Sequence, residues 1–165
     1  MATKKKGKVD IVYGEDLPYW ETSRSQLNTW LGRVKKLLDN PDIKSKYVAF
    51  AMAEMASCEG GYMIDFEIQG RLYRIKWPIL PSRNGKEGSA SIQAITMMHH
   101  DIKSRIVTAQ VLGPENAFLS YMLLDGNRTV GDIVSNGGNL AATLPPLLAA
   151  PTKSTDDNIV EGEIV

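Results

Sequence analysis

Two neighbouring segments of the chain alternate large apolar residues with polar ones, which is the pattern of a β-hairpin with one buried face. In residues 62–68 the large apolar side chains fall on even positions, and in residues 71–77 most fall on odd positions. A slip of one residue would expose the aromatic set to water, so the pattern predicts the register as well as the strands. A two-residue turn at 69–70 then gives five cross-strand pairs: Phe66–Tyr73, Ile64–Ile75, Tyr62–Trp77, Asp65–Arg74 and Met63–Lys76.

Two other stretches repeat apolar residues every three or four positions, the spacing of an amphipathic helix. The first follows N-cap candidates in residues 22–25, and Asn40-Pro41 stops it. Its stripe consists of Leu27, Trp30, Leu31, Val34, Leu37 and Leu38. The second starts at Ser89 or Ser91 and ends at Gly113-Pro114. Its stripe consists of Ile92, Ile95, His99, Ile102, Ile106 and Ala109.

Residues 47–55 are ambiguous, because their alanines and methionines favour a helix while Val48, Phe50 and Met52 alternate with small residues. A glycine-containing turn follows, so we expect a first strand that leads into the hairpin. After the second long helix, residues 115–124 predict a short helix. Residues 129–134 predict a brief helical or strand segment.

These elements predict an α+β fold made of a helix, a three-stranded antiparallel sheet, a long helix and a short helical appendage. A three-stranded sheet with one apolar face needs a cover, which the two amphipathic helices supply. The other face, with Asp65, Glu67, Arg74 and Lys76, stays open to solvent or to a partner.

The composition of the ends sets the expected domain limits. Lysines crowd the first residues, and we expect 1–19 to be a mobile basic arm. Residues 20–136 form a single α+β domain. Residues 137–165 are expected to be an Ala/Leu/Pro-rich linker followed by an acidic disordered tail.

The chain of 165 residues has 19 basic and 19 acidic side chains, so its net charge predicts no class of partner. One cysteine, Cys58, excludes an internal disulfide framework and indicates a reducing compartment. No apolar run approaches the length that spans a bilayer, and no apolar segment follows the first lysines as in a secretory signal. We therefore expect a cytoplasmic protein with no membrane partner.

Positive charge is concentrated in residues 71–105, which contain seven basic and two acidic side chains. Tyr73 and Trp77 lie among them and could stack on bases, although the predicted register buries both. We expect a non-enzymatic accessory protein that holds DNA or RNA through backbone phosphates. The candidate nucleic-acid-binding residues are Arg71, Arg74, Lys76, Arg83, Lys86, Lys103 and Arg105.

A protein–protein interaction or self-assembly module is the alternative. It would use the open sheet face or a sheet edge, and methionine side chains adapt to partner surfaces. The chain has six methionines that could serve this role: Met52, Met55, Met63, Met97, Met98 and Met122. The acidic tail is either a solubilising end, a docking peptide or a cover for the basic stretch.

Patterns for catalysis and metal binding are sparse. A P-loop, a dinucleotide-binding glycine fingerprint, a nucleophile elbow and a zinc-metallopeptidase pair are all missing from the sequence. His99 and His100, with Cys58 and Asp101, would form an incomplete metal site, because adjacent helical residues point about 100° apart. We therefore expect no metal and no cofactor.

The enzymatic alternative is a metal-dependent nuclease. Asp65 and Glu67 share a strand face beside Lys76, where the acids would hold an ion and the lysine would steady the attacking water. The usual close acid-x-lysine spacing of such enzymes is missing, and cross-strand ion pairs are common on any solvated sheet. We expect the protein not to be an enzyme.

The predicted helix–strand–strand–strand–helix order of residues 22–112 resembles the double-stranded-RNA-binding domain, and its last four elements are similar to the core of phage single-strand annealing proteins. Loop 57–61 lacks the proline–histidine element of the RNA-binding family, so no residue role carries over. Four runs look like small phage and prophage proteins: GRLYRI at 70–75, AFL at 117–119, LDGNRTVG at 124–131 and LPPLL at 144–148. This resemblance implies a mobile-element origin, a host-cytoplasmic location and a role in recombination, replication or host takeover.

Overall fold

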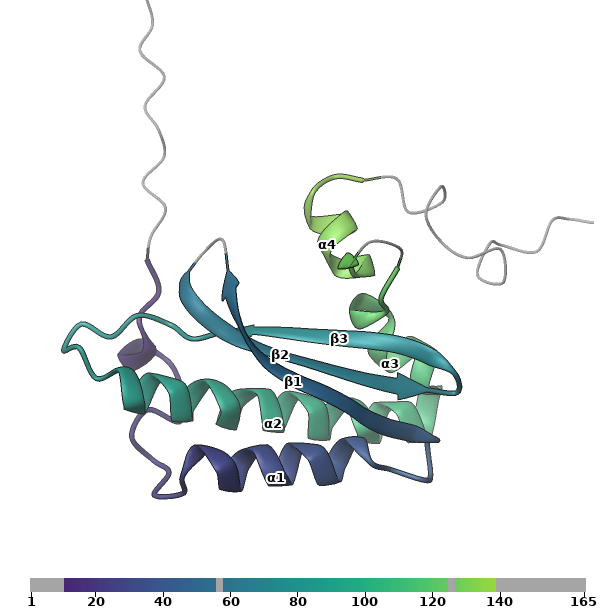
Figure 1. Cartoon of the computed structure of the whole chain (residues 1–165), viewed down its shortest axis with the longest axis horizontal. Helices are drawn as coiled ribbons and strands as arrows, with labels where there is room; N and C mark the ends of the chain where they lie inside the picture. The colour runs from purple at the N-terminus through teal and green to yellow at the C-terminus, as the bar shows by residue number, and fades with distance from the viewer. Residues whose placement is uncertain (1–10, 56–57, 125–126, 139–165) are drawn as a thin grey trace, which may run out of the picture.

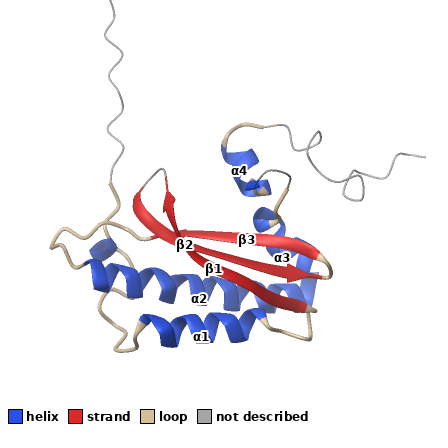
Figure 2. Cartoon of the chain, in the orientation of Figure 1, coloured by secondary structure: helices blue, strands red, loops and turns tan. Residues whose placement is uncertain are grey.

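The computed structural model describes residues 11–55, 58–124 and 127–138. It confirms the α+β fold: two long helices lie behind a three-stranded antiparallel sheet of order β1-β2-β3, and short helices follow (Figures 1 and 2). The elements are η1 (Gly14–Asp16), α1 (Leu27–Leu38), β1 (Ser45–Met55), β2 (Cys58–Ile68), β3 (Arg71–Pro78), α2 (Glu87–Leu112), α3 (Pro114–Phe118), η2 (Leu119–Tyr121) and α4 (Val130–Ser135).

The β2–β3 hairpin has the register that the sequence predicts, and all five predicted cross-strand pairs are confirmed. Gln69 and Gly70 form the turn with φ of 52° and 81°. Two consecutive positive φ values belong to the tight turn whose twist matches that of the flanking strands, and glycine adopts such a φ without strain. The local turn chemistry and the alternation of apolar residues therefore specify the same pairing.

β1 is confirmed as the first strand, but its alternation changes phase at a bulge. Tyr47 pairs with Phe66, whereas Ala49 pairs with Asp65, so Val48 is the extra residue. Phe50 then joins the helix-facing side of the sheet opposite Ile64, and Val48 stays exposed. The alanines that follow the bulge point to the other face.

The core lies between the sheet and the two long helices. Most helix-facing side chains of β2 and β3 are almost completely buried and pack against apolar residues of α1 and α2, whereas Trp77 is half-buried. Their burial removes most of their apolar surface from water, which is the main favourable term for this layer. The buried residues of the sheet are Tyr62, Ile64, Phe66, Ile68, Tyr73 and Ile75, and those of the helices include Val34, Leu38, Ile95, Met98, Ile102 and Ile106.

Part of the predicted mobile arm is tied to the domain. The buried Gln93 amide of α2 donates to the carbonyl oxygens of Gly14 and Pro18, both at 2.8 Å. The Gly14 amide donates to the Pro81 carbonyl at 3.0 Å, so the segment around η1 is held between α2 and the loop after β3. Residues 1–10 of the arm, and 139–165 of the predicted linker and tail, lie outside the described residues.

The helical appendage differs in detail from the expectation of one helix over 115–124. α3 and η2 are followed by an extended stretch, because Met122 bridges to Tyr73 and the Leu123 amide donates to the Leu72 carbonyl at the β3 edge. Phe118 anchors α3, with its ring 5.3 Å from that of Phe66 in an edge-to-face arrangement. The brief segment at 129–134 is helical and forms α4.

Candidate functional site

Six of the seven cations that the sequence selects for nucleic-acid binding form an ion pair with a carboxylate. The pairs are Arg71–Glu115, Arg74–Asp65, Lys76–Asp132, Arg83–Asp16, Lys86–Glu21 and Arg105–Asp101, with N···O distances of 2.5 to 3.1 Å. Lys103 is the member of the set for which no such pair is formed with a described residue. The six paired cations are distributed over β3, the loop that follows it and α2. Each of them forms its ion pair with a different carboxylate.

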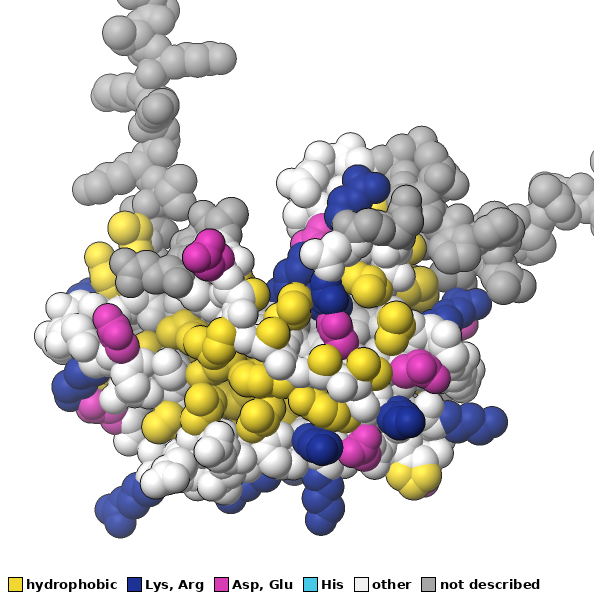
Figure 3. Space-filling model, in the orientation of Figure 1, with side chains coloured by type: hydrophobic (Ala, Val, Ile, Leu, Met, Phe, Trp, Pro, Cys, Tyr) yellow, Lys and Arg dark blue, Asp and Glu magenta, His cyan; other side chains and the backbone are white. Residues whose placement is uncertain are grey.

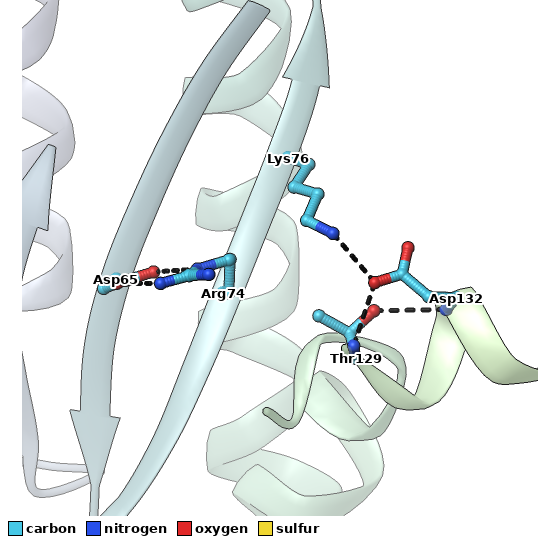
Figure 4. A network of polar contacts seen from close by, with 5 residues as sticks. All are labelled: Asp65, Arg74, Lys76, Thr129 and Asp132. Atoms are coloured by element: carbon cyan, nitrogen blue, oxygen red, sulfur yellow. Dashed lines mark hydrogen bonds and ion pairs between the residues drawn. The ribbon is translucent and has the colours of Figure 1, made fainter. Parts of the chain in front are cut away.

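The Arg74–Asp65 pair is the least exposed of these. Arg74 donates Nε to Oδ1 at 2.6 Å and an Nη to Oδ2 at 2.7 Å, a two-bond contact across β2 and β3 (Figure 4). Hydrogen bonding to Asp65 raises the pKa of Arg74. The side chains of Arg74 and Asp65 are only 12% and 20% exposed. Asp65 is thus held by Arg74, whereas the nuclease alternative would have it hold an ion.

Beside this pair the open face is apolar over one part of β1 and β2, whereas Lys46 and Glu67 lie opposite each other at its other end. Ala49, Ala51 and Ala53 pair with Asp65, Met63 and Gly61, so all of them point away from the helices. Gly61 has no side chain, and the sulfur and methyl carbon of Met55 occupy the place where its Cβ would be. Figure 3 looks onto this face and shows hydrophobic side chains gathered over β1 and β2. We call Ala49, Ala51, Ala53, Met55 and Met63 the open apolar face.

A polar network borders the open apolar face on the β3 side and holds α4 there. Lys76 on β3 donates to Asp132 at 2.9 Å, and Asp132 also accepts from the backbone amide of Thr129 (Figure 4). Thr129 caps α4 in return by accepting from the Asp132 amide. Burial would raise the pKa of Asp132, but the bonds from Thr129 and Lys76 outweigh it and lower the pKa. A cleft of about 180 Å³ lies between α4 and β3.

A second, larger pocket of about 380 Å³ lies between β3 and the N-terminal half of α2. Trp77, Met97 and Leu17 are among its mainly apolar lining residues, and Tyr121 closes one side. Burial, and the nearby Asp101 carboxylate that accepts from its hydroxyl, raise the pKa of Tyr121 to about 12. Tyr121 is therefore neutral and donates a hydrogen bond at physiological pH.

The two histidines point to different neighbours. The His99 ring meets Trp30 edge to face at 5.1 Å, and the His100 ring stacks on Tyr19 at 4.7 Å. Asp101 binds Arg105 and Tyr121. Across the described ranges there is no group of three or more side chains of the metal-binding types.

The outer surface of the helix layer carries positive charge around His99. Burial lowers the pKa of His99, and charge interactions with His100, Arg33 and Lys103 lower it further. The buried Nδ1 of His99 has no hydrogen-bond partner in the described part of the chain. Arg33 lies over the Trp30 ring at 4.5 Å in a cation–π contact, and it forms no ion pair with an acid among the described residues.

Comparison of the chain with protein-family models, with curated proteins and with solved structures found no match. The resemblance to phage proteins thus stays a prediction. None of the helices in the described residues is long and apolar enough to cross a bilayer.

The open apolar face was not predicted from the sequence, although the spacing of its residues is present there. The alanines at 49, 51 and 53 are spaced two apart, the spacing of one strand face. Their small size, together with the bulge at Val48, hid the pattern.

Proposed function

We propose that this chain is a non-enzymatic self-assembly module that binds a second copy through the open apolar face. The observation that carries the proposal is the row of Ala49, Ala51 and Ala53 beside Met55 and Met63 on the sheet face opposite the helices. A solvated sheet face ordinarily carries polar side chains, and contiguous exposed apolar surface on a protein marks an interaction site.

The face has the properties of a sheet that packs against another sheet. Small alanines let two backbones approach to the spacing of about 10 Å that stacked sheets adopt. Methionine side chains adjust to irregular partner surfaces. The Asp65–Arg74 pair at the edge of the patch is already neutralised within one chain, so it can be covered without leaving a lone charge. A two-fold arrangement would match each patch with itself.

Sedimentation of the full chain over a concentration series tests the proposal, with Ala51→Lys as the disrupting variant. Val107→Lys is the matched control, because it adds the same charge at a position on α2 that is 56% exposed and far from the sheet face. We expect the mass to rise with concentration in the unaltered chain and in the control. Ala51→Lys should weaken association at least tenfold, about 1.4 kcal/mol, since a lysine would be buried without a partner. A single-chain mass at every concentration, or equal loss in both variants, contradicts the proposal.

A second candidate function is nucleic-acid binding through backbone phosphates. The observation that favours it is the positive charge of Arg33 and Lys103 on neighbouring helices, since neither forms an ion pair with an acid in the part of the chain that the structure describes. Binding of fluorescent single- and double-stranded oligonucleotides over a salt series tests it. We expect Arg33→Gln with Lys103→Gln to reduce the slope of log affinity against log salt by about 1.4 to 1.8, the value for two lost phosphate contacts.

The matched control for that experiment is Arg83→Gln with Lys86→Gln, which removes two cations that already have acidic partners. We expect this control to change the slope little. The absence of binding at low salt removes the candidate. A larger effect of the control than of the Arg33 and Lys103 variant would instead favour the residues that the sequence selected.

A further inference from the structure

The open apolar face is large enough, and close enough to the end of the described chain, to be covered by the chain itself. β2 has 11 residues and is thus about 37 Å long, and the face extends over residues 49–55 of the neighbouring β1, about 24 Å of strand. The face is bordered by the Lys76–Asp132 contact, which fastens α4 beside β3 (Figure 4). Gly138, the last described residue, follows α4 by three positions, and Figure 1 shows α4 on the β3 side of the sheet. The chain therefore continues from a point next to the face.

The sequence after that point has an unusual composition. Residues 139–152 contain no charged side chain but include four leucines and three prolines, and an acidic stretch follows. Pro145-Pro146 favours the extended polyproline II conformation, which has three residues per turn and needs no internal hydrogen bonds. In that conformation Ala141, Leu144, Leu147 and Ala150 would share one side of the segment.

We infer that residues 139–152 of the same chain bind across the open apolar face and compete there with a second copy. At about 3.1 Å per residue the segment reaches about 43 Å, which exceeds the length of β2. Leu144 and Leu147 pack on the alanine row of β1 and beside Met63. The proline rings restrict the unbound segment, so less conformational entropy is lost on binding.

This inference rests on the proposed function, since it assigns a regulator to the same face. Within one chain the segment is held near the face at high effective concentration, so even a weak contact competes with a second molecule. Self-association is then partly suppressed in the unaltered chain, and loosening the segment strengthens it.

The test uses the full chain labelled with ¹³C at the methionine methyl groups. Met55 and Met63 report on the open apolar face, and Met98 and Met122 in the core serve as internal references. The disrupting variant is Leu144→Glu with Leu147→Glu. The matched control is Ile159→Glu with Val160→Glu, which places the same charges outside the segment.

We expect the disrupting variant, kept dilute, to shift the Met55 and Met63 signals and leave those of Met98 and Met122 unchanged. Its sedimentation should show association at least threefold tighter than that of the control. Unchanged Met55 and Met63 signals overturn the inference. If those signals instead depend on protein concentration alone, a second copy is the occupant, which overturns the inference and leaves the proposed function standing. Shifted signals without any self-association keep the inference and refute the proposed function.

Discussion

The Asp65–Arg74 pair offers a quantitative test of the sheet face. We predict that Asp65→Leu and Arg74→Leu are each destabilising, whereas the double variant is much less so. The pair joins β2 to β3 by two charge-assisted hydrogen bonds of 2.6 and 2.7 Å, and its side chains are 20% and 12% exposed. Each single variant leaves the other charge on a mostly covered surface without a partner.

The expected magnitude lies between two limits. A fully exposed pair contributes about 0–1 kcal/mol, and breaking a fully buried one costs about 3–5 kcal/mol. For these exposures we expect each single variant to lose about 2 kcal/mol. The double variant should lose about 1 kcal/mol or less, because two leucines opposite each other on neighbouring strands pack together. The coupling energy between the two positions is then about 3 kcal/mol.

Urea unfolding followed by circular dichroism measures the four free energies of unfolding, with protein dilute enough to remain monomeric. The two-state fit should return equal m values for the four proteins. The reasoning would be refuted if each single variant lost less than about 0.5 kcal/mol and the loss of the double variant equalled the sum of the two single losses. Such a result would mean that water screens the pair and that the face around it is not covered by its neighbours.

Three further predictions follow from packing and titration. Gly61→Ala should lower the free energy of unfolding by about 1–3 kcal/mol, because its Cβ would displace Met55 and lie 2.6 Å from the Trp77 carbonyl oxygen. Gly32→Ala, in mid-helix with open space around it, should instead raise the free energy of unfolding by about 0.5–1 kcal/mol. Chemical denaturation that finds the Gly61 variant more stable than the Gly32 variant would contradict the crowding at Gly61 and the open space at Gly32. The pKa of His99 is lowered in the folded state, so the unfolded chain binds more protons below about pH 6.5 and stability falls as pH drops through that value. His99→Phe should flatten the stability curve between neutral pH and about pH 5, and an unchanged curve would contradict burial of the ring. The pKa of Asp132 is lowered in the folded state, so the carboxylate stabilises the fold above about pH 4 and this stabilisation is lost as pH falls further. Asp132→Asn should therefore remove the acid dependence of hydrogen exchange in α4. Equal acid sensitivity in both proteins would exclude the Lys76–Asp132 contact as the anchor of α4.

The sequence predicted the hairpin in full because three local signals agreed. The large residues of β2 and β3 alternate, Gln69-Gly70 suits a two-residue turn, and Asp65 and Arg74 are opposite in charge. The long helices followed from apolar stripes, although α2 begins at Glu87, ahead of the expected serine caps. Local patterns of this kind carry their own register, so a fold can be derived from them.

The candidate site was less accessible to sequence reasoning, because it depends on contacts between distant residues. The excess of cations in 71–105 is real, but partners such as Asp16 and Asp132 come from other parts of the chain. Counting charges within a window cannot find these pairs. The bulge at Val48 likewise inverts the faces of β1 in a way that alternation alone does not show.

The central claim is that the open apolar face is covered in the full chain, and the solvent accessibility of Met63 tests it most directly. A soluble paramagnetic agent broadens methyl signals according to their exposure, and the chain contains both references: Met98 is fully buried and Met52 is 62% exposed. We predict that the Met63 methyl is broadened nearly as little as that of Met98. Met63 is half-buried by its own neighbours, so broadening clearly above that of Met98, between the values for Met98 and Met52, would contradict the account, because the face would then be bare in the whole chain.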